Sequence, residues 1–271
     1  MVGMQGLIGE LRGVEERLRR ALWGSYMPEN SAGEFGLTAL YQEQFQVIHA
    51  VSPKILDRIY RLRFQIYCVE NRFEDPADNP NGRERDANDD RAAHLLLLHR
   101  ESGEAAGTAR VILPELEDRP LPIEEVLDTD GRQSFRDLPP GSTGEISRFA
   151  VSRVFRRHQL QEFRFPPGTM RFITFGLFRG ILEICLERRI THVTAIMEPA
   201  LLRLLSRFGL NFHAIGGLVE YHGLRQPCVA RLQELIDNVR QGCQPLWLYA
   251  GSGTPTAAAA QGISIPSLAS R

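Results

Sequence analysis

The chain has 271 residues, of which 43% are hydrophobic and 24% are charged, and its formal net charge is -1 at neutral pH. This length and composition suit one large domain that buries a sizeable core, alone or with appended arms. The near-neutral balance argues against wholesale nucleic-acid binding, which usually needs a strongly basic surface. No run approaches the roughly 18 apolar residues that a membrane span requires.

The two ends of the chain differ in composition from its middle. Apolar residues recur at helical spacing between Leu7 and Trp23, which predicts an amphipathic arm, and a Pro/Gly/Ser stretch at Pro28–Gly36 predicts a linker. Gly251–Arg271 is almost free of charge and aromatic residues, which predicts a flexible tail. We expect an arm and linker over residues 1–36, a folded domain over 37–250 and a tail over 251–271.

The compartment is predicted from the N-terminus and the cysteines. No long apolar stretch follows a basic start, so a signal peptide is not expected. The four cysteines are widely spaced and form no CxxC pair, which is typical of reduced thiols and not of a zinc site or a disulfide frame. We therefore expect a cytoplasmic protein.

The middle of the chain alternates between helical and strand patterns. A helix is predicted at Pro53–Val69, followed by a polar loop and by a β-hairpin formed from Ala93–His99 and Ala106–Leu113. A long Pro- and Asp-containing connection then leads to the second half. The predicted elements there are a strand at Glu145–Val151, a helix at Phe172–Arg188, a strand at His192–Met197, a helix from Pro199 to Gly209, a strand at Asn211–Tyr221 and a helix at Val229–Val239. This order predicts a mixed α/β fold with one central sheet.

Several familiar sites are absent from the sequence. We find no P-loop, no strand–GxGxxG–helix unit, no GxSxG elbow and no HExxH motif, and the seven histidines are scattered. The densest polar feature is an acidic cluster of Glu84, Asp86, Asp89 and Asp90. A solvated loop explains such a cluster equally well, and a calcium site is less favoured because the EF-hand glycine and distal glutamate are missing. Its place just before a buried strand would let it present carboxylates to a cationic amine.

Charged residues also fall inside predicted apolar elements. Glu145 and Arg148 lie in the Glu145–Val151 strand, where charged side chains are rare unless paired or functional. Strict alternation places these two on opposite faces, although a β-bulge would change that. Arg63 and Tyr67 lie one turn apart on the first helix, and Arg110 in a buried strand needs a carboxylate partner. A structural ion pair and a surface arginine are the plain alternatives to functional roles.

Taken in order, these motifs resemble a known group of enzymes. An arginine and an aromatic residue four apart, ExDxxD before a strand, a Gly-x-x-Arg strand and ExSRF together resemble the acyl-homoserine-lactone (autoinducer) synthases. The chain is still more similar to their relatives, the N-acyl amino acid synthases and the PEP-CTERM/exosortase-associated acyltransferases. That longer fit lies between Tyr41 and Pro227 and includes Leu62–Cys68, Glu145–Val151, Met197–Pro199 and Tyr221–Pro227.

The resemblance implies an acetyltransferase-like (GNAT, acyl-CoA N-acyltransferase) α/β fold in which an amine attacks an acyl thioester. It implies catalytic roles for Glu145 and Arg148, with Glu145 removing a proton from the amine. The substrate-binding residues that it implies are Arg63, Tyr67, Phe73, Asp86, Asp89 and Arg110. Tyr67 stands where autoinducer synthases usually have phenylalanine, and Phe73 falls near the position of their tryptophan. No metal and no tightly bound cofactor are expected.

The donor is predicted from the segment after Val151. Coenzyme-A-dependent members of the fold turn there through a glycine-rich loop that holds the pyrophosphate, and this chain has no glycine before Gly168. It carries arginines instead, at positions 153, 156, 157, 164, 171 and 179. We expect acyl carrier protein as the donor, docked on Arg153, Arg156 and Arg157. A merely solvated basic face is the alternative.

The function predicted from the sequence is transfer of a long-chain acyl group to the amine of a small acceptor, an amino acid in the first instance. The apolar residues of 172–182 would form a wall for a chain of more than roughly ten carbons, although they could equally pack a core. One alternative is an autoinducer synthase that uses S-adenosylmethionine as the acceptor. Another is an acyl-binding protein without catalytic activity.

Overall fold

The computed structural model describes residues 42–114, 119–162 and 169–242. The predicted arm, linker and tail at residues 1–36 and 251–271 therefore lie outside the described residues. None of the described helices is long and apolar enough to cross a membrane. Cys68, Cys185 and Cys228 are free and buried.

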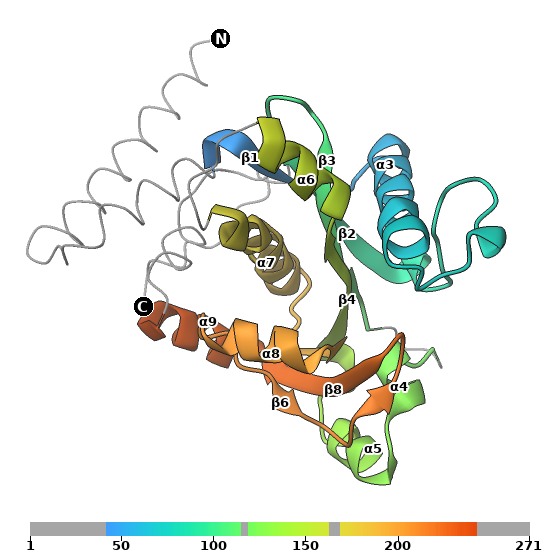
Figure 1. Ribbon diagram of the computed structural model, residues 1–271. Helices are drawn as coiled ribbons and strands as arrows, with labels where there is room; N and C mark the ends of the chain where they lie inside the picture. Colours follow the sequence, from blue (N-terminus) through green and yellow to red (C-terminus); the bar gives the residue numbers. More distant parts are fainter. Residues whose placement is uncertain (1–41, 115–118, 163–168, 243–271) are drawn as a thin grey trace, which may run out of the picture.

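One mixed sheet forms the centre of the fold. Its path runs in the order β1-β2-β3-β4-β5-β8-β6, with β7 paired to β8 (Figure 1). Every pairing is antiparallel except that of β4 with β5. The strands are β1 Phe45–His49, β2 Ala92–His99, β3 Ala105–Ile112, β4 Thr143–Val151, β5 His192–Met197, β6 His213–Ala214, β7 Val219–Glu220 and β8 Leu224–Arg231.

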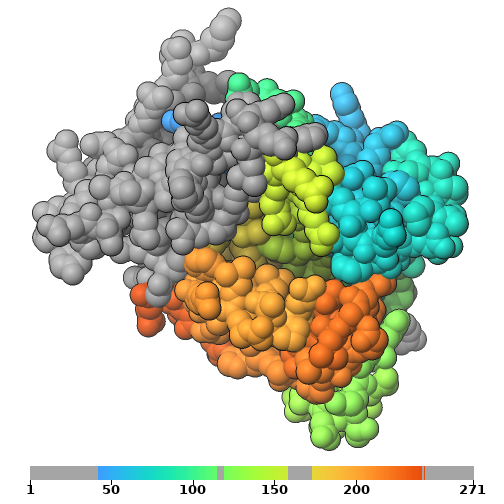
Figure 2. All heavy atoms as spheres, viewed as in Figure 1, coloured from blue at the N-terminus to red at the C-terminus, as the bar shows by residue number. Residues whose placement is uncertain are grey.

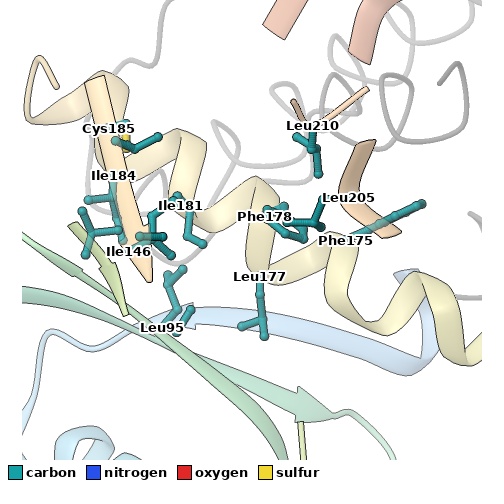
Figure 3. Packing of buried hydrophobic residues seen from close by; sticks show 14 of the residues in the cluster. Leu95, Ile146, Phe175, Leu177, Phe178, Ile181, Ile184, Cys185, Leu205 and Leu210 are labelled. Atoms are coloured by element: carbon teal, nitrogen blue, oxygen red, sulfur yellow. The ribbon is translucent and has the colours of Figure 1, made fainter. Parts of the chain in front are cut away.

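Alternation along β2 separates the two faces of the sheet. Leu95 and Leu97 point into the main core with α7, Thr169–Glu187, whereas Leu96 points into a second cluster with α3, Pro53–Arg63. The two helices accordingly lie on opposite sides of the strands (Figure 1). Figure 3 shows side chains of α7 against strand residues such as Leu95 and Ile146.

The remaining helices are short: α4 Pro122–Val126, α5 Thr129–Arg136, α6 Arg153–Glu162, α8 Pro199–Ser206 and α9 Leu232–Gly242. Of these, α6 lies beside β1 and β3, whereas the others lie around the second half of the sheet (Figure 1). Single turns of 3₁₀ helix occur at Pro76–Asp78, Asp89–Arg91 and Pro140–Ser142. Ile123 of α4 packs on Ile112 of β3. Ile112 is two residues from Arg110, so both side chains point to the face of the sheet that α3 covers.

The strands β4 and β5 pair over only three residues each and then separate. Thr143–Glu145 pairs with His192–Thr194, after which β4 continues beside β3 and β5 continues beside β8. Figure 2 shows a hollow in the surface between α6, the blue segment that includes α3, and the orange segment that includes α8 and β8. The divergence of the two strands therefore opens the middle of the sheet toward solvent.

Most of the predicted elements are confirmed, and three predictions are corrected. The final strand is β8 at Leu224–Arg231, not Asn211–Tyr221, which holds only the short β6 and β7. The last helix consequently starts at Leu232 and not at Val229. The connection before β4, predicted as a loop, contains α4 and α5, and β1 was not predicted.

Candidate active site

Arg63 is the buried centre of the polar network under α3. It is the last residue of α3, and its side chain is fully enclosed against the α3 face of the sheet. Its guanidinium donates hydrogen bonds to Glu84 and, at 2.6 Å, to Asp89. Since a buried guanidinium is costly unless it is paired, the acidic loop before β2 has to fold under the helix.

Arg110 joins the network from β3. Its guanidinium contacts both carboxylate oxygens of Asp86 at 2.6 and 2.9 Å and one oxygen of Asp89 at 2.6 Å. It also donates to the hydroxyl of Ser147 on β4, the residue paired with it across the sheet. The carboxylate partner that the sequence required for this buried arginine is therefore Asp86 together with Asp89.

A β-bulge in β4 directs Arg148 toward the same network. The β3–β4 register shifts between Thr108 and Arg110, and Arg148 adopts the left-handed region at φ 50°. Its guanidinium lies 2.9 Å from Glu84, 3.1 Å from Glu74 and 3.2 Å from Asp86. Strict alternation along β4 is thus broken at Arg148, and the bulge anticipated as an alternative is confirmed.

Paired arginines keep the network carboxylates charged. Burial alone would raise the pKa of Asp86, but hydrogen bonding and charge from Arg110 hold that pKa at about 2. The pKa of Glu84 and that of Asp89 are likewise held below their usual values, against burial, by Arg63 and a second arginine each. Three arginines face four carboxylates when Glu74 is included, so the network carries one net negative charge.

Glu145 has the opposite electrostatic environment. Its carboxylate is 2% exposed and accepts a hydrogen bond of 2.8 Å from the backbone N–H of Ile123 at the start of α4. Burial raises its pKa to about 7, although that N–H and the charge of Arg110 oppose the rise. Among the described carboxyl groups with a shifted pKa, Glu145 is the one shifted upward. It lies at the last residue pair before β4 and β5 separate.

An aromatic ring lies against Arg148, and a second ring lies beside the first. The helix that begins with α3 continues as a π-helix, Phe64–Glu70, and carries Tyr67. The guanidinium of Arg148 lies 5.0 Å from the Tyr67 ring centre, and the Phe73 ring centre lies 6.4 Å from that of Tyr67. The structure therefore brings together Arg63, Tyr67, Phe73, Asp86, Asp89, Arg110 and Arg148, while Glu145 lies under α4 on the same face of the sheet.

A carboxylate closes the N-terminus of α6, the helix that follows β4. Glu70 accepts hydrogen bonds from the backbone N–H of Arg153 at 2.7 Å, the N–H of Val154 at 3.4 Å and the hydroxyl of Ser152 at 2.7 Å. Arg153, Arg156 and Arg157 are all exposed. Arg179 is not part of this basic surface, because it is buried and paired with Glu183 at 2.9 Å. Arg164 and Arg171 lie outside the residues whose side chains are described.

Sequence reasoning missed three residues, two beside the network and one at the start of α6. Glu74 and Glu70 lie in or near a polar loop, where a carboxylate attracts no notice, and only the fold brings them to Arg148 and α6. Tyr221 was part of a recognised motif but had no role, and its ring centre lies 4.9 Å from that of His222, whose Nε2 lies 3.7 Å from the Glu74 carboxylate. Within the described residues, no group of three or more His, Cys, Asp and Glu is arranged to hold a metal ion.

Comparison with known proteins agrees with this architecture. Residues 62–164 match the family model described as an acetyltransferase (GNAT) domain. The fold is that of the GNAT acyltransferases. A search of curated protein sequences finds no significant match.

Solved structures with this GNAT-like fold include autoinducer synthases. TofI, solved in a ternary complex with an inhibitor and MTA, is 19% identical with a TM-score of 0.53, covering 73% of this chain and 96% of that one. BjaI, a CoA-dependent acyl-homoserine lactone synthase solved with SAM and isopentyl-CoA, is 24% identical with a TM-score of 0.52, covering 73% and 88%. FeeM, an N-acyl amino acid synthase from uncultured soil microbes, is 20% identical with a TM-score of 0.48, covering 72% and 94%. The likenesses to TofI and BjaI show the fold, which agrees with the acetyltransferase (GNAT) domain match.

Proposed function

We propose that this chain is an N-acyltransferase that moves a long-chain fatty-acyl group from acyl carrier protein to the amine of a small acceptor such as an amino acid. The observation that carries the proposal is Glu145, a buried carboxyl group with a pKa of about 7 at the point where β4 and β5 separate. A group with that pKa can accept a proton near neutral pH, which is what acylation of an amine requires. We further propose that the chain belongs with the PEP-CTERM/exosortase-associated acyltransferases, and this part of the proposal rests on the sequence motifs alone.

The residues divide the reaction between them. The acceptor arrives as an ammonium ion, which the negative edge of the network at Asp86 and Glu74 attracts. Glu145 takes one proton, directly or through a water molecule, and the free amine attacks the thioester carbonyl carbon. Backbone N–H groups on the side of β4 that β5 no longer covers are suited to stabilise the oxyanion. Collapse of this intermediate forms the amide, breaks the C–S bond and releases the carrier thiol.

The cap on α6 supports acyl carrier protein as the donor. Helix N-termini bind anions through free backbone N–H groups, and a coenzyme A diphosphate would need those of α6. Here the Glu70 carboxylate accepts from Arg153 N–H and Val154 N–H, so that position is occupied by a negative charge of the chain itself. The arginines at 153, 156 and 157 are exposed, Arg156 with one hydrogen bond of 3.3 Å to the Val151 carbonyl, and their charge suits an acidic carrier protein.

The experiment that tests the proposal measures thiol release. Purified full-length chain is mixed with acyl carrier protein charged with acetyl to palmitoyl groups, and with glycine, leucine, tyrosine, ethanolamine or S-adenosylmethionine. We expect release that depends on both donor and amine, with an N-acyl product detected by mass spectrometry. Release that no amine stimulates would contradict the proposal and favour an acyl-binding protein.

A second candidate function is synthesis of an acyl-homoserine lactone from S-adenosylmethionine. BjaI, described with SAM, shares the fold, which is the observation in favour of this acceptor. The same assay separates the two functions, because a lactone product formed with S-adenosylmethionine and none with the other amines would assign the chain to this second reaction.

A further inference from the structure

A tight turn joins β7 to β8 next to the network. Tyr221, His222 and Gly223 form it, with φ values of 52° at His222 and 95° at Gly223. The N–H of Tyr221 donates to the carbonyl of Gly223 at 2.9 Å, and the N–H of Gly223 donates to the Glu220 carboxylate at 2.9 Å. The pairs Val219–Arg225 and Glu220–Leu224 continue the hairpin, so the backbone of the turn is fixed by its own hydrogen bonds.

The turn is also held against the loop that follows the π-helix. The ring of His222 lies 5.7 Å from that of Phe73, and the guanidinium of Arg225 lies 5.8 Å from the same ring. His222 Nε2 lies 3.7 Å from the Glu74 carboxylate, which Arg148 contacts at 3.1 Å. The C-terminal hairpin and the N-terminal half of the domain thus meet at the edge of the network.

Exposure shows which part of the network a small molecule can reach. The side chains of Arg63, Asp89 and Arg110 are 0–2% exposed, whereas those of Asp86 and Glu74 are 27% and 28% exposed. Tyr221 lies at this open edge, because its ring centre is 4.9 Å from that of His222, whose Nε2 lies 3.7 Å from the Glu74 carboxylate. A molecule bound at the exposed carboxylates would therefore lie beside the Tyr221 ring.

We propose that Tyr221 is the specificity-determining residue of the acceptor site, and that its ring limits the size of the acceptor's side chain. The inference rests on the proposed acyl transfer and deepens it. The acceptor's ammonium group binds at the solvent-exposed side of Glu74 and Asp86, beside the Arg148 guanidinium that bridges them. Its side chain points to the Tyr221–Gly223 turn, which Phe73 and Arg225 hold in place. The donor approaches from α6 and does not touch the turn. Contacts between a substrate side chain and an apolar pocket wall change discrimination between substrates by about 10–200-fold.

The test compares acceptors in the wild-type chain and in Tyr221→Ala. The assay follows thiol release from decanoyl-carrier protein, with glycine, leucine and tyrosine as separate acceptors. We expect the Ala variant to raise kcat/KM for tyrosine relative to glycine by at least tenfold, because the ring no longer occupies that space. The KM for the charged carrier protein should stay within twofold of the wild-type value. Tyr221→Phe, which keeps the ring, should keep the wild-type order of acceptors.

Leu224→Ala provides the matched control. Leu224 lies in the same hairpin, but 53% of it is exposed, so its loss should leave acceptor preference unchanged. An unchanged ratio of kcat/KM for tyrosine to kcat/KM for glycine in Tyr221→Ala would overturn the inference. So would an equal loss of activity with every acceptor, if that loss follows the folded fraction of the variant. A wild-type chain without amine-dependent release would remove the proposed function itself, and the inference with it.

Discussion

Replacing Glu145 with glutamine separates its chemical role from its structural one. The glutamine carbonyl can still accept the hydrogen bond from Ile123 N–H, so the start of α4 stays capped. The amide cannot take a proton from the acceptor amine. We expect amine-dependent turnover to fall on the order of 10²-fold or more, as is typical for loss of a general base.

The same variant should change stability in a pH-dependent way. Because burial raises the pKa of Glu145 from 4.5 to about 7, the native state holds this proton more tightly than the unfolded chain does. Stability associated with the neutral form is therefore present below pH 4.5 and is lost as the pH rises through about 7. At 1.36 kcal/mol per pKa unit, the loss amounts to about 3 kcal/mol. Glutamine has no proton to lose, so Glu145→Gln should gain that amount relative to wild type between pH 4.5 and pH 8.

Two measurements check this prediction. Urea denaturation at pH 5 and pH 8 gives the free energy of unfolding of both proteins, and kcat/KM of the wild type against pH should rise through about 7. An early-melting variant whose residual activity follows its folded fraction would show that Glu145 is structural. Equal stability of the two proteins at both pH values would show that its pKa is not raised.

Three further expectations follow from the same structure. Arg63→Met should destabilise the fold by about 3–5 kcal/mol in urea denaturation, because the buried network loses one of its three guanidinium charges and leaves Glu84 with only Arg148 and Asp89 with only Arg110. Arg61→Met should cost much less, because the Arg61 side chain is 57% exposed and its pair with Asp57 is solvated. Arg156→Glu combined with Arg157→Glu should raise the carrier-protein KM steeply at low salt and little at high salt, with kcat nearly unchanged; a salt-independent KM would refute this docking surface. Palmitoyl thioesters should react much faster than acetyl ones, since each buried methylene contributes about 0.8 kcal/mol, and a series without preference would argue that the apolar residues of α7 only pack the core.

The elements that the sequence predicted correctly have strong local patterns. The β2–β3 hairpin, β4, α7, β5 and α8 combine apolar periodicity with clear start and stop residues. The strand β8 was missed because it contains Pro227, and proline is uncommon inside a strand that has neighbours on both sides. The π-helical turn at Phe64–Glu70 could not be predicted, because the 3.6-residue pattern simply continues through it.

The site was predictable to the extent that its residues lie in local motifs. The ordered motifs identified Arg63, Asp86, Asp89, Arg110 and Arg148, and the structure joins all five in one network. The contributions of Glu70, Glu74 and Tyr221 depend on which loops meet in three dimensions. No local pattern encodes such contacts, since each of these residues is ordinary in its own segment.

The two kinds of carboxylate in the site have environments that suit different tasks. Asp86, held at a pKa of about 2 by Arg110, keeps its charge and attracts an ammonium ion, but it is too weak a base to deprotonate one. An ordinary glutamate has a pKa of about 4.3, whereas that of Glu145 is about 7. At about 1.36 kcal/mol per pKa unit, the proton of any given ammonium ion therefore moves to Glu145 at a cost lower by about 4 kcal/mol. Burial under α4, where the Glu145 carboxylate accepts from a backbone N–H while Asp86 accepts from an arginine, therefore makes Glu145 the better base by more than about 3 kcal/mol. The three buried arginines keep the binding carboxylates charged at the same pH.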